Sequence, residues 1–346
     1  MVSTPANSGA RCGATGISAV PRRRVLLVRS DGIGDALVCA PLVAALASAG
    51  HELGAVFSTR NREAFAAATF AHVHVLERIP WPKHGSTPET RRTALAEARA
   101  VDYDVALIVS EEPEAYEFAR AAGARRRIGF INGWEKPLKS LRFRALLDEA
   151  IVRTASAARA DEHEVETVFR LGRDLHGELL PTRDPARLAP LVLDAPAVAH
   201  GRVVVQLSPK LAGAGLDVQT WVLILRALAA RSGPPLVLAD DAELASAVRD
   251  AGFEVVLPEA REWKAAIAGA RALVAPDSGA IHVAGMTGVP SLALFAPGPA
   301  ATRDIARWSP WAAPGTARLV GPRGGDFLAR DVSADVERLL VERAAR

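Results

Sequence analysis

Two carboxylates stand in the short segment SDGIGD at residues 30–35, directly after the predicted strand VLLVR at residues 25–29. Positioned carboxylates serve enzymes as general acids and bases, and glycines let a ligand approach the backbone closely. Asp35 therefore has two interpretations. It is either a base that takes a proton from a substrate, or only a carboxylate at a helix N-terminus, which the helix dipole stabilises by about 0.3–1 kcal/mol. Asp31 and Gly34 would lie beside the same substrate.

A dinucleotide-binding fingerprint is the competing interpretation of this segment, and it fits poorly. The third glycine of that fingerprint is replaced by Leu37. The fingerprint also needs an acid after the second strand to hold a ribose, and the chain has Val56, Phe57 and Ser58 there. The spacing argues against an NAD-dependent dehydrogenase.

A second segment with chemical potential is DSGAIH at residues 277–282, between an apolar strand and a helix. Backbone amides of Ser278, Gly279 and Ala280 at the start of a helix form a natural site for a phosphate. Asp277 is either a ligand contact or only the N-cap of that helix. His282, one turn further on, either faces the same ligand or is a packed structural residue.

The elements that would position both segments alternate between short β-branched runs and longer helical stretches, which is typical of a parallel sheet flanked by helices. Residues 25–180 form the first such unit. We expect strands at residues 25–29, 54–58, 72–76, 104–109 and 127–130, and helices at 35–49, 61–68, 88–100, 114–122 and 161–177.

The pattern restarts in a second unit at residues 202–332, after a Pro-, Ala- and Asp-rich linker at residues 181–201. Ligands of open α/β sheets bind at the carboxyl ends of the strands, so the two units are predicted to face each other across a cleft. A C-terminal helix at residues 333–346 would begin with Ser333 as N-cap. We expect strands at residues 203–207, 236–239, 254–257, 272–275 and 291–295, and helices at 218–230, 242–251, 261–268 and 280–288.

Composition places the chain among ordinary globular proteins, with 49% apolar and 23% charged residues. The net charge of +3 is concentrated in residues 1–24, which hold four arginines and no acid and are expected to be a disordered tail. Subtracting those four charges leaves −1 for the rest of the chain, and no nucleic-acid motif is present. No apolar run reaches the length of a membrane span. Cys12 and Cys39 suit neither a disulfide nor a metal cluster, so a cytoplasmic location is expected.

One part of the first unit is strongly basic. Residues 120–144 hold eight Lys or Arg side chains, Arg126 among them, against the single acid Glu135. Such a segment either faces a phosphorylated or carboxylated acceptor or is simply a solvated face. Arg60 and Arg62 follow the second strand and would join it on the same side of the sheet.

Three segments together resemble glycosyltransferase family 9, the ADP-heptose lipopolysaccharide heptosyltransferases. They are RSDGIGD at residues 29–35, AGARRRIGF at residues 122–130, and APDSGAIHVA at residues 275–284 with GVP at residues 288–290. The resemblance extends from about Val25 to Trp311. It implies a GT-B fold with two Rossmann-like domains facing across a cleft, an acceptor in the first and a nucleotide-sugar in the second. The implied reaction inverts the anomeric centre and needs no metal or other cofactor.

The resemblance also implies roles for individual residues. Asp35 matches the general base of the family. Ser278 and Gly279 match contacts to the donor phosphates, Asp277 a contact to the donor sugar, and His282 a neighbouring site residue. An acid after residues 236–239 would contact the nucleotide ribose, with Asp240 and Glu243 as candidates, although both also suit a helix N-terminus.

The chain departs from the family at three places. The basic residue expected before the helix near Trp221 is missing from the segment AGLD at residues 214–217, and Lys210 is the nearby cation that would replace it. The usual Gly-Pro-Thr is replaced by APGP at residues 296–299, and a neutral Gln-Gly by Glu111 and Glu112.

These observations favour a glycosyltransferase that moves a heptose or related sugar, with ADP-heptose as the expected donor. The acceptor would be a glycan such as a lipopolysaccharide core sugar, or a small molecule, and an anionic acceptor would suit the basic segment. The enzyme would associate peripherally with the inner face of the membrane. A protein of the same fold that binds a nucleotide-sugar without transferring it is the alternative, because of the missing basic residue and threonine.

Overall fold

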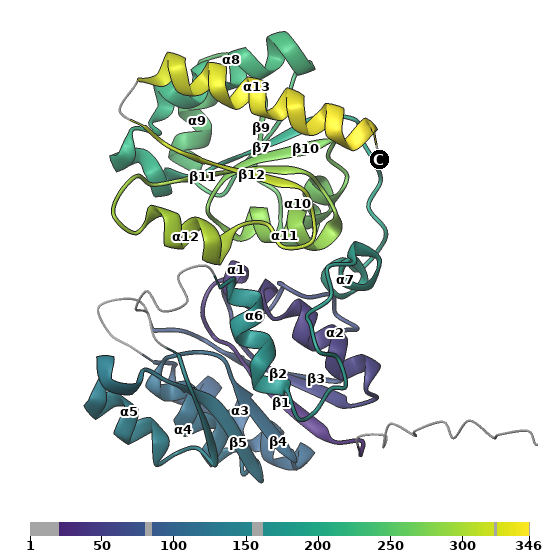
Figure 1. Cartoon of the computed structure of the whole chain (residues 1–346), viewed down its shortest axis with the longest axis vertical. Helices are drawn as coiled ribbons and strands as arrows, with labels where there is room; N and C mark the ends of the chain where they lie inside the picture. The colour runs from purple at the N-terminus through teal and green to yellow at the C-terminus, as the bar shows by residue number, and fades with distance from the viewer. Residues whose placement is uncertain (1–20, 80–84, 154–161, 322–323, 346) are drawn as a thin grey trace, which may run out of the picture.

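The computed structural model describes residues 21–79, 85–153, 162–321 and 324–345. They form two α/β halves, stacked one above the other in Figure 1, and each half is built on a six-stranded parallel sheet. The predicted arrangement of two doubly wound units is confirmed.

The sheet of the N-terminal half has the strand order β3-β2-β1-β4-β5-β6, so the segment at residues 30–35 follows a central strand. That strand, β1 (Arg24–Val28), is apolar and buried after its first residue, as expected for a strand covered by helices on both faces. Arg24, assigned above to the tail, is its first residue, and residues 1–20 of the tail lie outside the described part of the chain. The other strands are β2 (Glu52–Ser58), β3 (His72–Leu76), β4 (Val105–Ile108), β5 (Arg126–Ile131) and β6 (Glu149–Val152).

The helices of this half differ from the prediction in four places. The helix expected at residues 161–177 is shortened to α6 (Glu164–Phe169) and the 3-10 turn η3 (Arg170–Gly172), and α5 (Pro137–Arg144) was not predicted. The helix expected at residues 35–49 is divided into α1 (Ile33–Leu37) and α2 (Ala40–Ser48), with Pro41 in the first turn of α2, where its missing N–H is tolerated. Residues 61–68 form turns rather than a helix, because the buried Asn61 side chain accepts from Ser58 N and donates to the Arg29 carbonyl. The remaining helices are α3 (Pro88–Val101) and α4 (Pro113–Ala121).

The sheet of the C-terminal half has the order β12-β11-β10-β7-β8-β9, and β10 (Ala272–Pro276) leads into α11 (Gly279–Thr287). The other strands are β7 (Val203–Leu207), β8 (Leu236–Ala239), β9 (Val255–Val256), β11 (Ser291–Phe295) and β12 (Gly315–Leu319). The other helices of this half are α8 (Val218–Ser232), α9 (Ala242–Asp250), α10 (Ala260–Ala268), α12 (Ala301–Trp308) and α13 (Gly325–Ala344).

The predicted linker is structured. It contains α7 (Pro185–Val192), whose Leu188 and Val192 side chains are buried in a core shared by the two halves. Lys264 of α10 reaches across to this helix and donates to the Val192 carbonyl at 2.7 Å. An ammonium group at the carboxyl end of a helix is electrostatically favourable, so this contact stabilises the junction.

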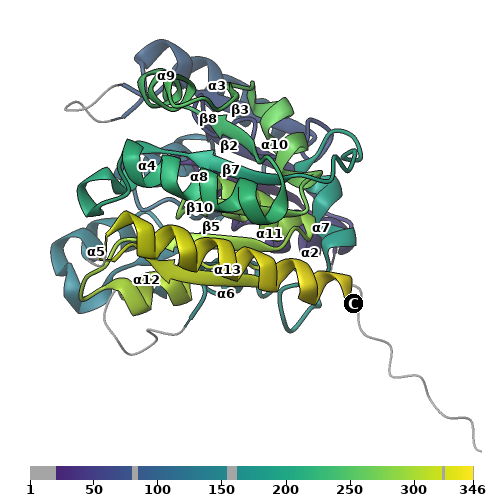
Figure 2. The same ribbon diagram turned by 90° about the horizontal axis from the view of Figure 1, so that it is seen from above.

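The last helix begins earlier than predicted. Apolar residues Leu328, Val332, Val336 and Leu339 keep a helical spacing on both sides of Ser333, and all four are buried. Ser333 is therefore inside α13, where its hydroxyl donates to the Arg330 carbonyl, and is not an N-cap. The helix packs along α8 on the C-terminal half, as Figure 2 shows from above.

None of the helices in the described ranges is long and apolar enough to cross a membrane. Cys39 is a free, buried thiol whose pKa is raised by burial to about 12, and Cys12 lies outside the described residues.

Candidate functional site

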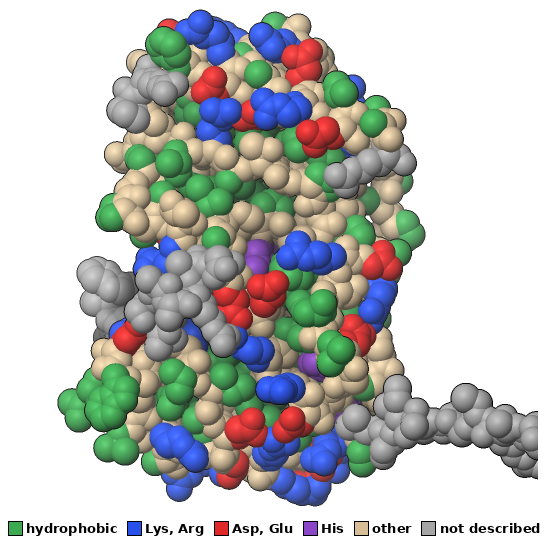
Figure 3. Space-filling view, viewed as in Figure 1, with side chains coloured by type: hydrophobic (Ala, Val, Ile, Leu, Met, Phe, Trp, Pro, Cys, Tyr) green, Lys and Arg blue, Asp and Glu red, His purple; other side chains and the backbone are tan. Residues whose placement is uncertain are grey.

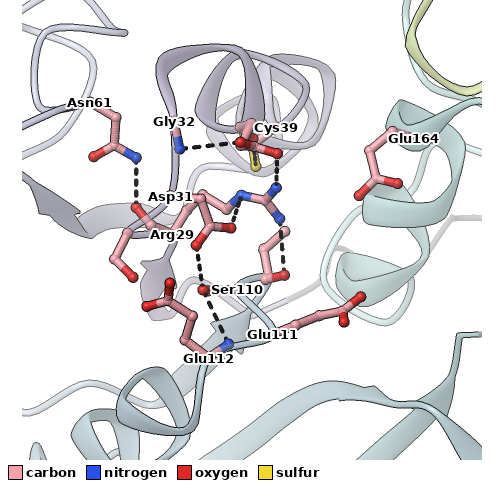
Figure 4. A network of polar contacts seen from close by, with 12 residues as sticks. Arg29, Asp31, Gly32, Cys39, Asn61, Ser110, Glu111, Glu112 and Glu164 are labelled. Carbon is pink, nitrogen blue, oxygen red and sulfur yellow. Dashed lines mark hydrogen bonds and ion pairs between the residues drawn. The ribbon is translucent and has the colours of Figure 1, made fainter. Parts of the chain in front are cut away.

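A buried arginine organises the loop after β1. Arg29 is 3% exposed and donates from Nη2 to Asp35 Oδ1 at 2.7 Å and from Nη1 to the Val109 carbonyl at 3.0 Å. Its Nε lies 3.2 Å from Asp31 Oδ2, and Asp31 Oδ1 accepts from the Ser110 hydroxyl at 2.8 Å (Figure 4). One cation thus fixes both carboxylates of the segment.

The charges of this network support one another. Burial lowers the pKa of Arg29, but the carboxylates of Asp31 and Asp35 outweigh that effect and the net shift is upward. Burial raises the pKa of Asp31, and the neighbouring guanidinium opposes the rise. Arg29 is therefore a permanent cation, and Asp31 ionises less readily than a carboxyl group in water.

The geometry of Asp35 is compatible with both of its interpretations. Its Oδ2 accepts from the Gly32 amide at 3.1 Å, so it closes the N-terminal turn of α1 as a helix carboxylate does. The side chain nevertheless keeps about one third of its surface exposed. The carboxylate is fixed in direction and accessible, which is the geometry that a general base requires.

The loop after β10 contains unpaired polar atoms. Ser278 is the N-cap of α11, and its Oγ is buried without a hydrogen-bond partner among the described residues, as is Nδ1 of His282. Lys210 donates from Nζ to the carbonyl of Asp277 and lies 3.0 Å from its Oδ2. The start of α11 thus offers free amides, two unpaired side-chain atoms and one cation, a set suited to an anion.

The two loops touch. A Cβ atom on Gly34 would lie 2.9 Å from His282 Cδ2 and 3.4 Å from Gly279 Cα. A Cβ on Gly279 would lie 2.7 Å from Cγ2 of Ile33. Only glycine allows this approach, which brings the N-termini of α1 and α11 together between the halves.

Burial keeps His282 uncharged and lowers its pKa from 6.5 to about 3. The unfolded chain takes up a proton below pH 6.5 that the folded chain does not, so stability falls as the pH falls. Between pH 7 and pH 5 the unfolding free energy should therefore fall by about 2 kcal/mol less in His282→Asn than in wild type. Urea denaturation at the two pH values measures both decreases. An equal loss in wild type and variant would contradict this assignment. The control is His72→Asn, at a partly exposed histidine on β3.

Further contacts tie the halves together near the site. Glu164, the first residue of α6, is 1% exposed, and its Oε2 accepts from Arg307 Nε of α12 at 2.8 Å. The same carboxylate accepts from Arg153 at 2.7 Å and points toward the Arg29 network (Figure 4). Burial raises the pKa of Glu164, and the arginines oppose the rise. His163 adds a hydrogen bond to the Ser309 carbonyl at 2.7 Å.

Other predicted site residues lie outside this junction. Arg60 and Arg62 follow β2 and are exposed, with Arg62 paired to the adjacent Glu63. Asp240 and Glu243 follow β8 and are also exposed. They lie at the carboxyl edges of their sheets, as expected, but on strands beside the central ones.

Arg126 does not reach the site. It is the first residue of β5, at the opposite edge of the sheet from Asp35, and it pairs with Glu149 and Asp174. Most of the basic segment at residues 120–144 is similarly neutralised by acids outside it. The further ion pairs are Arg125 with Asp102 and Asp104, Arg127 with Asp148, Lys139 with Glu111, and Arg142 with Glu117.

The departures from the family pattern have local roles. Asp217 caps α8 by accepting from Thr220 N at 2.8 Å. Glu112 pairs with Arg78, and Glu111 lies 3.1 Å from Arg153, so both acids are engaged within the N-terminal half. The residues at 296–299 are exposed after β11.

Solved structures with a similar fold cover nearly the whole chain. A family 9 glycosyl transferase from Veillonella parvula DSM 2008 has a TM-score of 0.67 at 12% identity, covering 94% of this chain and 99% of that one. E. coli heptosyltransferase WaaC with ADP has a TM-score of 0.68 at 17% identity, covering 91% and 99%. E. coli ADP-heptose lps heptosyltransferase II has a TM-score of 0.61 at 15% identity, covering 93% and 99%.

The chain has the fold of these proteins. The predicted GT-B architecture is thereby confirmed. No protein-family model and no curated protein matches the sequence. At these identities the likeness establishes the arrangement of the chain, and the activity rests on the site.

Two residues central to the site were not predicted from the sequence. Arg29 was noted only as part of a motif, and Glu164 only as part of a helix. The signal for Arg29 was available, because an arginine at the end of a fully apolar strand is buried and needs carboxylates nearby. No comparable signal marks Glu164, whose burial depends on the packing of α12 against α6.

Proposed function

We propose that the protein is an inverting glycosyltransferase that moves a sugar from a nucleoside diphosphate donor to an acceptor hydroxyl in the cytoplasm. The observation that carries this proposal is the meeting of the exposed Asp35 carboxylate with the anion-accepting start of α11. A base and a diphosphate site on facing loops are what the transfer of a sugar between them requires. The shared fold with heptosyltransferases supports the same conclusion.

On the donor side, the diphosphate would occupy the start of α11. The amides of Gly279 and Ala280 would bind phosphate oxygens, and the Ser278 hydroxyl and His282 ring would gain the partners they lack. Lys210 would balance the charge that develops on the leaving group, which makes a metal unnecessary. Asp277, held by Lys210, would accept from hydroxyls of the donor sugar.

On the acceptor side, Asp35 would take the proton of the acceptor hydroxyl as its oxygen attacks the anomeric carbon. The new glycosidic bond forms on the face opposite the diphosphate, and the bond to the phosphate oxygen breaks, so the configuration inverts. Arg29 would hold the Asp35 carboxylate in direction throughout.

ADP-heptose is the donor that we propose to test first, because a solved relative of this fold was determined with ADP-2-deoxy-2-fluoro heptose. The assay incubates the purified chain with ADP-heptose and candidate glycan or small-molecule acceptors and measures ADP release and product mass. Transfer supports the proposal. Binding of ADP without any transfer would instead support a protein that only binds the nucleotide-sugar, a candidate favoured by the cap role of Asp217 at the position of the usual basic residue.

Lys210→Ala is expected to weaken ADP binding about tenfold, because a charge-assisted contact to phosphate is lost. Isothermal titration calorimetry of wild type and variant would measure the change in Kd. Lys210→Arg should retain most of the affinity, and Arg231→Ala, at an equally exposed cation on α8, should leave it unchanged. Equal affinities of the wild type and Lys210→Ala would remove Lys210 from the donor site.

A further inference from the structure

A stripe of large apolar side chains on the N-terminal half is open to solvent. Trp134 is 95% exposed, Leu138 84% and Leu141 72%. Trp134 belongs to the 3-10 turn η1 (Gly133–Glu135), which leads into α5, and the other two residues belong to α5. Leu138 and Leu141 are three residues apart and lie on the same side of α5, and Trp134 stands in the turn just before the helix. Figure 3 shows a hydrophobic cluster at the lower left, where Figure 1 places α5.

The stripe faces solvent because the opposite side of α5 packs into the core of the N-terminal half. Phe143 is buried and stacks on Tyr116 with ring centroids 4.0 Å apart. Ser140 is also buried, and its hydroxyl donates to the Gly133 carbonyl at 3.0 Å, which joins α5 to η1. The outward residues therefore have no place in the protein interior, and three such side chains on a turn and the short helix that follows it are unusual for a solvated surface.

Basic residues surround the stripe. The segment at residues 133–144 holds four Lys or Arg side chains and the single acid Glu135. Lys139 and Arg142 pair with Glu111 and Glu117, while Lys136 and Arg144 are exposed and carry the positive charge beside the stripe. Beside α5 lies a hollow of about 690 Å³ whose lining includes Arg99, Arg120 and Arg142 together with Glu117. Although Glu117 pairs with Arg142, the hollow keeps an excess of positive charge.

The stripe begins at the edge of the sheet that carries the site, and α5 runs from there toward the amino ends of the strands, where the hollow lies. Turn η1 follows the carboxyl end of β5, as the Asp35 loop follows that of β1. Lys139 of α5 lies 3.8 Å from Glu111, and Glu111 lies 3.1 Å from Arg153, which contacts Glu164. A short chain of ion pairs thus connects α5 to the junction.

We propose that the stripe Trp134–Leu138–Leu141 docks the protein on an anionic lipid bilayer. Tryptophan and leucine side chains insert at the boundary between headgroups and acyl chains, and flanking cations bind anionic headgroups. A second copy of the chain is a poorer occupant, because a symmetric contact would oppose basic residues to basic residues. Docking itself does not require the transfer reaction. Its consequence, a membrane-borne acceptor presented to Asp35, rests on the proposed function.

The test is flotation of the full chain with vesicles of phosphatidylglycerol and phosphatidylcholine in equal parts, and with phosphatidylcholine alone. Wild type should float with the anionic vesicles, and Trp134→Ser/Leu138→Ser/Leu141→Ser should reduce the bound fraction at least tenfold. The matched control Leu179→Ser/Leu180→Ser/Val198→Ser, which removes exposed apolar side chains elsewhere, should bind as wild type does. The double variant Lys136→Glu/Arg144→Glu should no longer bind the anionic vesicles. Circular dichroism should show that both triple variants are folded.

Three results would overturn the docking proposal. They are equal binding by wild type and the α5 triple variant, no binding by wild type, and self-association of wild type that the triple variant abolishes. Tryptophan fluorescence locates the contact. Adding anionic vesicles should shift the emission of wild type to the blue, and this shift should be lost in Trp134→Phe. Asp35→Asn should bind vesicles as wild type does, so docking and catalysis can fail separately.

Discussion

Asp35→Asn is expected to lower turnover by about 10²- to 10⁴-fold, the contribution usual for a general base. Asparagine keeps the size of the side chain and can still accept from the Gly32 amide, but it cannot take the proton of an attacking hydroxyl. The loss should therefore appear in kcat, with the Kd for ADP within about twofold of wild type. Steady-state kinetics with ADP-heptose and calorimetry with ADP measure the two quantities.

Asp184→Asn is the matched control for this variant. Asp184 is also a carboxylate at a helix N-terminus and accepts from Ala186 N at 2.9 Å, but it caps α7 away from the facing loops. Its turnover should equal that of wild type. If a folded Asp35→Asn protein keeps wild-type turnover, Asp35 serves only as the helix carboxylate that the sequence also allowed.

The fold was predictable because its signals are local. Apolar runs such as residues 203–207 and 291–295 are strands at the predicted bounds, and the alternation with helices places their carboxyl ends at one edge. Both candidate loops follow central strands for this reason. Lys210, predicted from the sequence to replace the missing basic residue of the donor site, lies beside Asp277 at the start of α11.

The missed features depend on tertiary packing. The helix α7 was taken as linker because its Pro185 and Pro190 obscure the helical period, and its stability comes from both halves. Arg126 was grouped with the site by charge, although its position at the start of β5 places it at the far edge. The stripe on α5 was missed because it faces outward, so no core periodicity marks it.

The junction couples the position of the base to the arrangement of the halves. Glu164 is shared by Arg153 of the N-terminal half and Arg307 of the C-terminal half, and it contributes to the field around Arg29. Gly34 meets Gly279 at the same place. The site is thus complete only when the halves meet, which would exclude water from the reacting groups.

Arg29→Met is expected to lower the free energy of unfolding by about 3–5 kcal/mol, the usual cost of removing one partner from a buried ion pair. Methionine fills the space of the arginine stem, but Asp31 and Asp35 would lose their counter-charge, and the Val109 carbonyl its donor. Urea denaturation at pH 7 measures the loss. Arg231→Met, which breaks an exposed pair with Glu337, should cost less than about 1 kcal/mol.

The cost of Arg29→Met should also depend on pH in a defined direction. The guanidinium lowers the pKa of Asp31 against the effect of burial, so its removal raises that pKa further. The folded variant then holds a proton that the unfolded chain has released, and its stability falls as the pH rises. The loss relative to wild type should be larger at pH 8 than at pH 5, and Asp31→Asn in the Arg29→Met background should remove most of this difference. A loss that is equal at both pH values would show that Arg29 acts through packing and not as the counter-charge of the loop.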